Sequence, residues 1–513
     1  MNSRFLSALT IIAGLGLSIA AHAQDETDAH RYSFLSPQGT ARSIGIGGAL
    51  GSIGGDFTSL SVNPAGIGVY RSSELMFTPS IKINNVSGTY QNTTMDDNAV
   101  RFNFNNLGVV FTGTAKGKRY ERTKWKSVSF GLGLNRLADF NRNVMYGGVN
   151  NTSSFSEVFV TDAIFFPDDV TNLNTPAGIG WNSFLIDEDS LGYFNVVPVG
   201  IDLNQRRAVQ ERGGINEIAI SLGGNYMEQF MIGATLGLPS LSYRRDMTFT
   251  EEDASNDATN NFRSLEYNES LSTSGLGINL KLGFIYKPTD AFRVGAALHT
   301  PTYFGLTDVQ NRSISTNTEG FKALIGDNTG PVTTLQSGLD IPENIFEYGL
   351  TTPWRGILSA TGFLGTFGFI TADYEYVDYR SARFHFDNSF AADEAYINQL
   401  IKNRYKAASN FRIGAEGRLD NLMIRLGFGY YGNPDNSGGD DRMVFSTGLG
   451  YRFDNWFMDL GFSHTSYQDQ EQPYAVQYPE NYFLNNPSGT IAVPKAAVKG
   501  NANNIALTVG WKF

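Results

Sequence analysis

Cysteine is absent from the 513 residues of this sequence, and charged side chains make up only 17% of it. The absence of cysteine excludes thiol catalysis, disulfides and thiolate metal sites. Positive charge is also scarce, because 39 Lys+Arg stand against 50 Asp+Glu and leave a net charge of −11. A chain of this balance lacks the electrostatic footprint of a nucleic-acid binder, so no nucleic-acid partner is expected.

Long apolar runs are missing as well, apart from one at the N-terminus. Arg4 precedes an apolar run over residues 6–20, and Ala21-His22-Ala23 then matches the A-x-A cleavage pattern. We predict a signal peptide over residues 1–23, cleaved after Ala23, because the run is too short for a membrane span. Beyond it, no run approaches the ~18 apolar residues of a transmembrane helix. The mature chain is therefore expected to be a secreted soluble protein or a membrane β-barrel.

Glycine, aromatic residues and alternation are what the sequence has in plenty, with 56 Gly and 13% aromatics. From Ile505 to Phe513, apolar side chains fill every odd position, and small or polar side chains fill every even one. This period of two is typical of a β-strand between two environments. In a soluble sandwich the apolar face would meet a shared core, whereas in an outer-membrane barrel it would face lipid.

Segment length and loop lengths favour the barrel. Most candidate strands meet or exceed the ~9–11 residues that a tilted strand needs to cross a bilayer, and short turns alternate with long loops. We predict fourteen strands, at roughly 72–83, 101–113, 125–137, 215–226, 229–249, 264–287, 291–306, 345–363, 366–383, 408–418, 421–431, 441–453, 456–468 and 504–513.

The predicted fold is therefore an all-β, 14-stranded antiparallel transmembrane β-barrel in the outer membrane of a Gram-negative bacterium. The barrel spans 72–513, with long extracellular loops at 138–214, 307–344, 384–407 and 469–503. Its expected partners are outer-membrane lipid and lipopolysaccharide around the wall, and the barrel-assembly machinery at the C-terminal Phe513.

The segment 24–71, ahead of the first strand, is rich in glycine and ends near an Asn-Pro pair. Pro64 holds Asn63 in extended geometry and ends any helix there. Because a fourteen-stranded lumen is too wide for wall side chains to fill, we predict that this segment plugs it as a hatch. A flexible linker is the alternative. The hatch glycines are Gly45, Gly47, Gly48, Gly51, Gly54 and Gly55.

The run GIGGALGSIGGDFTSLSVNPAGIGVYRSSELMFTPSI resembles the N-terminal hatch of the FadL/TodX family of outer-membrane channels for hydrophobic compounds, and Asn63, Pro64 and Ala65 match the Asn-Pro-Ala that closes it. The stretches ADYEYVDYR at 372–380, FRIGAEGRLDNLMIRLGFGYY at 411–431 and FSTGLGYRF at 445–453 resemble family strands. The resemblance implies passive uptake of long-chain fatty acids or other hydrophobic small molecules. It also implies a lateral exit through the wall near the third strand.

Two further features bear on this function. The apolar phase of the second strand changes between Phe104 and Leu107, which predicts a bulge at Asn105 and Asn106, either a local irregularity or part of a doorway. Inward-facing Lys281 and Arg293 are candidates for binding a ligand carboxylate through charge-assisted hydrogen bonds. The alternative for such residues is a solvated lumen wall with compensating charges.

Enzymatic motifs are missing from the sequence. It contains no G-x-S-x-G nucleophile elbow and no H-E-x-x-H zinc motif, so we expect no enzyme, no metal and no cofactor. The competing hypothesis is an outer-membrane surface receptor, for haem as one example, that uses the barrel as a platform for its long loops.

Overall fold

The computed structural model describes residues 26–36, 38–198, 200–255, 257–319, 321, 341–476 and 493–513. The predicted signal peptide lies outside them. Within these ranges no helix combines the length and the hydropathy of a membrane span.

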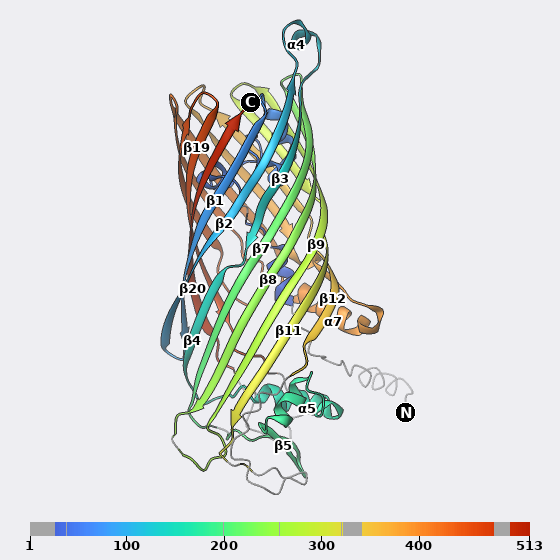
Figure 1. Ribbon diagram of the computed structural model, residues 1–513, viewed down its shortest axis with the longest axis vertical. Coiled ribbons are helices and arrows are strands. Elements are labelled where there is room, and N and C mark those ends of the chain that lie inside the picture. Colours follow the sequence, from blue (N-terminus) through green and yellow to red (C-terminus); the bar gives the residue numbers. More distant parts are fainter. Residues whose placement is uncertain are drawn as a thin grey trace, which may run out of the picture.

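The wall is a single closed antiparallel sheet (Figure 1). β1 (Glu74–Tyr90) pairs with β2 (Thr93–Thr114) on one side and with β20 (Ala496–Lys512) on the other, which closes the cylinder. The sheet has 18 segments, but four wall strands are each interrupted once, which leaves fourteen. The predicted fold class is confirmed.

The interrupted strands are β3 (Trp125–Asp139) with β4 (Arg142–Asn150), β10 (Phe292–His299) with β11 (Tyr303–Asn317), β12 (Asn344–Thr351) with β13 (Arg355–Phe363), and β14 (Gly368–Asp378) with β15 (Arg383–His385). The others are β7 (Leu203–Tyr226), β8 (Phe230–Asp253), β9 (Ser264–Thr289), β16 (Ala407–Leu419), β17 (Leu422–Tyr431), β18 (Arg442–Arg452) and β19 (Trp456–Glu471).

Alternation along each strand separates a lipid-facing surface from the lumen. On β9, Leu276 and Leu282 are 70% and 48% exposed, whereas Lys281, which points inward, is 2% exposed. Exposed apolar rows of this kind recur on most wall strands, because hydrocarbon rather than water surrounds them. This is the architecture of an outer-membrane β-barrel, as predicted.

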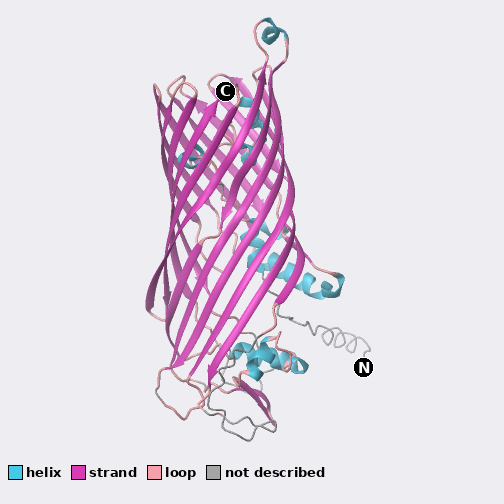
Figure 2. Ribbon diagram, viewed as in Figure 1, coloured by secondary structure: helices cyan, strands magenta, loops and turns pink. Residues whose placement is uncertain are grey.

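The two ends of the barrel differ (Figures 1 and 2). One end has short turns such as Met227–Glu228, where both residues adopt left-handed backbone angles, and it carries the C-terminus. α4 (Lys118–Arg122) rises from this end. The other end carries α5 (Glu157–Phe165), η2 (Pro167–Asp169), α6 (Pro176–Asn182), β5 (Ile186–Asp189) and β6 (Gly192–Asn195). By the rule that periplasmic turns are short, the first end is periplasmic.

The predicted loop boundaries need correction. The loop expected at 138–214 is shorter, because β3, β4 and the first half of β7 occupy much of it. The loop at 384–407 is largely helical, with η3 (Tyr379–Ser381) before it and η4 (Asn388–Phe390) and α7 (Ala391–Arg404) within it. β11 continues to Asn317, β19 to Glu471, and β20 already begins at Ala496. Residues 322–340 and 477–492, inside the other two expected loops, lie outside the described residues.

The N-terminal segment lies inside the cylinder. It contains α1 (Glu26–Ser33), α2 (Ala41–Gly45), α3 (Ser59–Val62) and η1 (Pro64–Val69). Almost every residue from Thr40 to Tyr70 is buried, and their partners come from many wall strands.

Candidate functional site

Glycines let the N-terminal segment turn tightly within the lumen. Gly47, Gly48, Gly54 and Gly55 have φ angles of 68°, 76°, 66° and 65°, in the left-handed region that favours glycine. Gly45 instead allows close approach, since an added Cβ would lie 3.2 Å from the Cα of Gly448 on the wall. Four of the six predicted hatch glycines are thus required by backbone conformation.

Asn63 ties the end of this segment together. It is extended, with φ −138° and ψ 102°, and Pro64 begins η1 directly after it. Its side-chain oxygen accepts a hydrogen bond from the backbone of Ala65 at 3.1 Å. Its amide nitrogen donates to the carbonyl oxygens of Gly51 at 2.5 Å and of Phe284, on the wall, at 3.3 Å. The Asn-Pro-Ala sequence therefore forms a helix cap that also binds the barrel.

Wall charges anchor the same segment. The Arg42 guanidinium is 3.1 Å from a carboxylate oxygen of Glu416, which also accepts from Arg425 at 2.6 Å. Arg425 in turn contacts Asp459 at 2.7 Å. On the next wall sector, a carboxylate oxygen of Asp373 accepts from the backbone nitrogen of Gly51 at 3.0 Å. The inward charges compensate one another while holding the segment.

Lys281 and Arg293 belong to this anchoring system. Lys281 pairs with the carboxylate of Glu217, whose other oxygen accepts from the Ser61 hydroxyl at 2.8 Å. Arg293 donates to the carbonyl oxygen of Ile53 at 2.7 Å, and its guanidinium lies 4.6 Å from the Phe363 ring centroid. The carboxylate that meets Lys281 is therefore a protein one. Both side chains therefore bind protein groups beside the N-terminal segment, and a contact of either with a ligand carboxylate stays a prediction.

Residues 40–70 of the N-terminal segment fill one level of the lumen. Between them and the extracellular end, aromatic side chains from many strands surround α1, the first helix of the same segment. We call this region the aromatic chamber. Tyr32 of α1 is 1% exposed, and its hydroxyl donates to the Thr273 hydroxyl at 3.1 Å. The centroid of its ring lies 6.0 Å from that of Phe140 and 5.9 Å from that of Tyr243. The chamber also includes Ala29, Leu241, Leu271, Phe304, Leu306, Tyr348, Leu350, Val377, Tyr379, Phe384, Ile401 and Tyr405.

His30 lies on the same helix. Its ring stacks on Tyr405 with centroids 5.2 Å apart. Burial, and to a lesser extent the charge of Arg442, lowers the pKa of His30 to about 3. The ring is therefore neutral at physiological pH, in keeping with apolar surroundings. The other histidines of the described ranges are engaged elsewhere: His299 with the Val62 carbonyl oxygen, His385 with Thr351, and His464 with Asn503.

A folded cap covers the extracellular mouth. Phe155 and Phe159, with α5 and α6, pack against Phe249 and Tyr267 of the barrel strands and against Tyr474. We use "the cap" for residues 151–198. It places apolar side chains directly over the lumen.

The wall is interrupted between β2 and β3. Their backbone pairing runs from Thr114 and Ser127 only as far as Asn106 and Asn135. Thr78 of β1 pairs with Asn106 and Pro79 with Phe104, so Asn105 is the extra residue of a bulge. Residues 93–104 of β2 therefore pair with β1 alone. Asn105 and Asn106 are buried, and Asn106 donates to the Asn135 side chain at 2.9 Å.

Asp139 bridges this interruption from the inside. Its carboxylate contacts Lys82 of β1 at 2.8 Å, Asn103 of β2 at 3.0 Å and Arg136 of β3 at 2.8 Å. Beyond it, β4 leaves the plane of the wall, and its Val144 and Tyr146 pack against Val86 and Tyr90 on the inward face of β1. The Asp139 carboxylate thus joins three strands at this bend, where Arg136 also donates to the Gly213 carbonyl oxygen of β7 at 2.8 Å.

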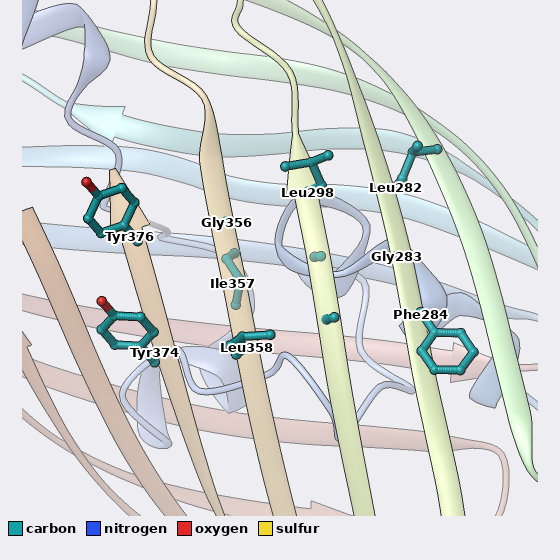
Figure 3. Close-up of a pocket in the computed structure, with 11 residues that line it drawn as sticks. Leu282, Gly283, Phe284, Leu298, Gly356, Ile357, Leu358, Tyr374 and Tyr376 are labelled. Carbon is teal, nitrogen blue, oxygen red and sulfur yellow. The ribbon is translucent and has the colours of Figure 1, made fainter. Parts of the chain in front are cut away.

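A hollow of about 400 Å³ on the outside of β9, β10, β13 and β14 is a separate feature (Figure 3). In one cross-strand row, Ala296 lies between Phe284 and Leu358; in the next, Gly356 lies between Leu298 and Tyr376. The small residues leave room between bulky neighbours. This hollow faces lipid, so it forms no part of the lumen.

Sequence reasoning missed the partners of the basic residues and the chamber itself. Three of these partners are carboxylates at inward positions, namely Glu217, Asp373 and Asp139. A carboxylate on a strand face that otherwise carries small residues could have indicated an ion pair in the lumen. Tyr243 and Tyr348 share the inward face of their strands in the same way.

No family model and no curated protein matches this sequence. Among solved structures, a FadL homologue from Pseudomonas aeruginosa matches with a TM-score of 0.53 and 12% identity, over 94% of this chain and 100% of that one. The toluene transporter TodX of Pseudomonas putida matches with a TM-score of 0.50 and 13% identity, over the same shares of 94% and 100%. The chain has the fold of these barrels over nearly its whole length.

Proposed function

We propose that this chain, which shares its fold with FadL-type and TodX barrels, is an outer-membrane channel for passive uptake of hydrophobic small molecules. The observation that carries the proposal is the aromatic chamber, enclosed by the cap above and by the N-terminal segment below, beside an interrupted stretch of wall. A lumen for hydrophilic solutes would need a continuous polar path. Here apolar rings occupy the middle of the lumen.

The N-terminal segment 26–71 acts as the hatch in this proposal. Its anchors come from strands on several sides of the barrel, through Glu416, Asp373 and Glu217. Moving it as one body would expose these buried charges together, which costs several kcal/mol for each uncompensated ion. A route that leaves the anchors intact is therefore favoured, and the interruption between β2 and β3 supplies one toward the membrane.

Substrates with a carboxylate, such as long-chain fatty acids, would bind their headgroup at Arg442. Its guanidinium lies 4.7 Å from the ring centroid of Phe34 and 5.6 Å from that of Tyr467, at the edge of the chamber. None of the ion pairs found among the described residues involves Arg442. A charge-assisted hydrogen bond to a ligand carboxylate is thus open to it.

Transport by reconstituted protein tests the proposal. Proteoliposomes containing the barrel should take up a fatty acid or a monoaromatic hydrocarbon faster than empty liposomes, while a sugar of similar size should enter no faster. Equal acceleration of the sugar would identify a general pore. No acceleration of either apolar solute would remove the channel function altogether.

A further inference from the structure

The turn between β2 and β3 concentrates positive charge on an otherwise acidic chain. Residues 115–126 read AKGKRYERTKWK, with six basic residues and one acid. None of them is buried. We call this turn the basic finger. Figure 1 shows its helix α4 standing beyond the rim that carries the C-terminus, farther than the other turns of that end.

The cations of the finger are unneutralised by the protein. Lys116, Lys118, Arg119, Arg122 and Lys124 take part in none of the ion pairs found in the described part of the chain. Lys126 donates to the Tyr120 carbonyl oxygen at 2.5 Å, and its ammonium lies 4.6 Å from the Tyr120 ring centroid. In contrast, lumen cations such as Arg425 contact protein carboxylates.

The finger is fixed to the rim rather than loosely tethered. Tyr120 donates to Glu228 in the turn between β7 and β8, and the same carboxylate pairs with Arg71. The backbone nitrogen of Met227 donates to the Lys124 carbonyl oxygen at 2.7 Å. Four other turns of this end carry an acid, at Glu228, Asp290, Asp420 and Asp454, and none of them carries more than one basic residue. Single cations such as Lys287, Arg418 and Lys512 also lie at this end, so the finger with its six basic residues is the densest cluster of positive charge on the rim.

Trp125 places this sector at the membrane surface. It is 45% exposed on the lipid-facing side, with its ring edge-on to Tyr226 at 5.4 Å. Amphipathic aromatics of this kind mark the interface of a barrel with the headgroups. Trp125 is the second-last residue of the finger, so the lysine and arginine side chains of the finger are within reach of the phosphates of the adjacent leaflet.

From this geometry we propose that the basic finger is a binding site for anionic phospholipid headgroups of the periplasmic leaflet. Phosphate is the complementary anion for closely spaced Lys and Arg side chains, and a basic cluster at a membrane surface gains about fivefold in affinity per charge, the equivalent of ~1 kcal/mol each. The site lies on the hairpin of β2 and β3, the two strands that part at the wall interruption. Lipid bound there would fix the periplasmic end of that hairpin.

The cysteine-free chain allows a direct test with a spin label at Thr123→Cys in the full-length barrel. In nanodiscs that contain phosphatidylglycerol, the label should be less mobile than in nanodiscs of phosphatidylcholine alone, and raised salt should reverse the change because exposed charges are screened. A label at Asn455→Cys, in an acidic turn of the same rim, should respond equally little in both lipids. Tyr120 and Lys126 stay unchanged so that the finger keeps its attachment.

Charge variants decide the outcome. Replacing Lys116, Lys118 and Arg122 by Gln should abolish the immobilisation at every phosphatidylglycerol fraction, because three charges at about fivefold each weaken binding by about 125-fold, whereas Glu121→Gln should lower the fraction needed for half immobilisation. Equal mobility in both lipids, or a response that survives the triple variant, would overturn the proposal. Immobilisation by soluble polyglutamate but not by phosphatidylglycerol would assign the finger to an acidic protein and would also overturn it.

Discussion

Asp139 at the bend of β3 accepts from Lys82 of β1 at 2.8 Å, across the place where β2 and β3 stop pairing. Asn103 of β2 reaches the same carboxylate at 3.0 Å. One side chain therefore joins three strands where the backbone ladder is interrupted. If substrates leave the lumen sideways, this carboxylate sets how far the wall is open.

Asp139→Asn should loosen the bend. The change leaves Lys82 and Arg136 without their carboxylate in a part-buried site, which we expect to cost ~2–3 kcal/mol of unfolding free energy. Small-solute leakage through reconstituted barrels should rise with it. Asp246→Asn is the control, because its partner Arg244 is mostly exposed and such pairs contribute about 0–1 kcal/mol. Equal effects of the two variants in urea unfolding and in leakage would contradict the account.

Arg442→Gln should discriminate between substrates. A fatty acid should bind about 10- to 150-fold more weakly, because one charge-assisted hydrogen bond contributes about 1.5–3 kcal/mol, while a neutral aromatic hydrocarbon of similar size should bind as before. Titration calorimetry in detergent measures both. Arg418→Gln, at the periplasmic end, is the matched control. A parallel loss for both ligands would mean that Arg442 only supports the packing of Phe34.

Asn63→Ala should weaken the hatch without unfolding the barrel. It removes the bonds to the Ala65 nitrogen and the Gly51 oxygen, and helix caps of this type contribute ~1–2 kcal/mol. We expect faster hydrogen exchange over residues 45–70, measured by mass spectrometry. Asn85→Ala, which loses only an exposed bond to Asn501, should leave exchange unchanged. Unaltered exchange in Asn63→Ala would show that the wall contacts alone hold the segment.

His30 predicts a pH dependence for the docking of α1. Its pKa is about 3 when buried and 6.5 when exposed, so the released helix binds the extra proton. The docked state is thus fully favoured above pH 6.5 and loses ~1.4 kcal/mol per pH unit as the pH falls toward 3. Protease cleavage within residues 26–36 should increase over this range. His30→Phe should remove that pH dependence, and cleavage that rises equally in both proteins would refute the assignment.

The part of the barrel wall that faces hydrocarbon, which we call the lipid belt, is the part of the fold that the sequence predicts well. Hydrocarbon outside and small or polar residues inside impose a period of two on β9 and β20, and the phase change on β2 falls at Asn105, where the bulge lies. Outside the belt this alternation weakens: Arg206 and Arg212 lie on the outer face of β7, and β4 contains two consecutive glycines, Gly147 and Gly148. The sequence therefore predicts loop for β4 and the first half of β7.

The partners of the site residues depend on register, which composition does not contain. β7, β8 and β9 align Ala219, Gly237 and Asn279 in one row, and Glu217 and Lys281 lie two residues to either side of it. Their side chains meet over Gly237, where an added Cβ would lie 2.5 Å from a Glu217 carboxylate oxygen. The aromatic chamber likewise assembles from strands far apart in the sequence, such as β8 and β12. Single-strand patterns therefore indicate which residues face inward without showing which of them touch.

The most direct test of lateral transport is to close the interruption covalently. Asn103→Cys with Asp139→Cys places the only two thiols of the chain where side chains are in contact at 3.0 Å. Transport of a fatty acid into proteoliposomes would be measured before cross-linking, after it and after reduction, with Asn103→Ser/Asp139→Ser treated in parallel. We predict that the cross-link abolishes uptake and that reduction restores it. Undiminished uptake through fully cross-linked protein would contradict exit between β2 and β3.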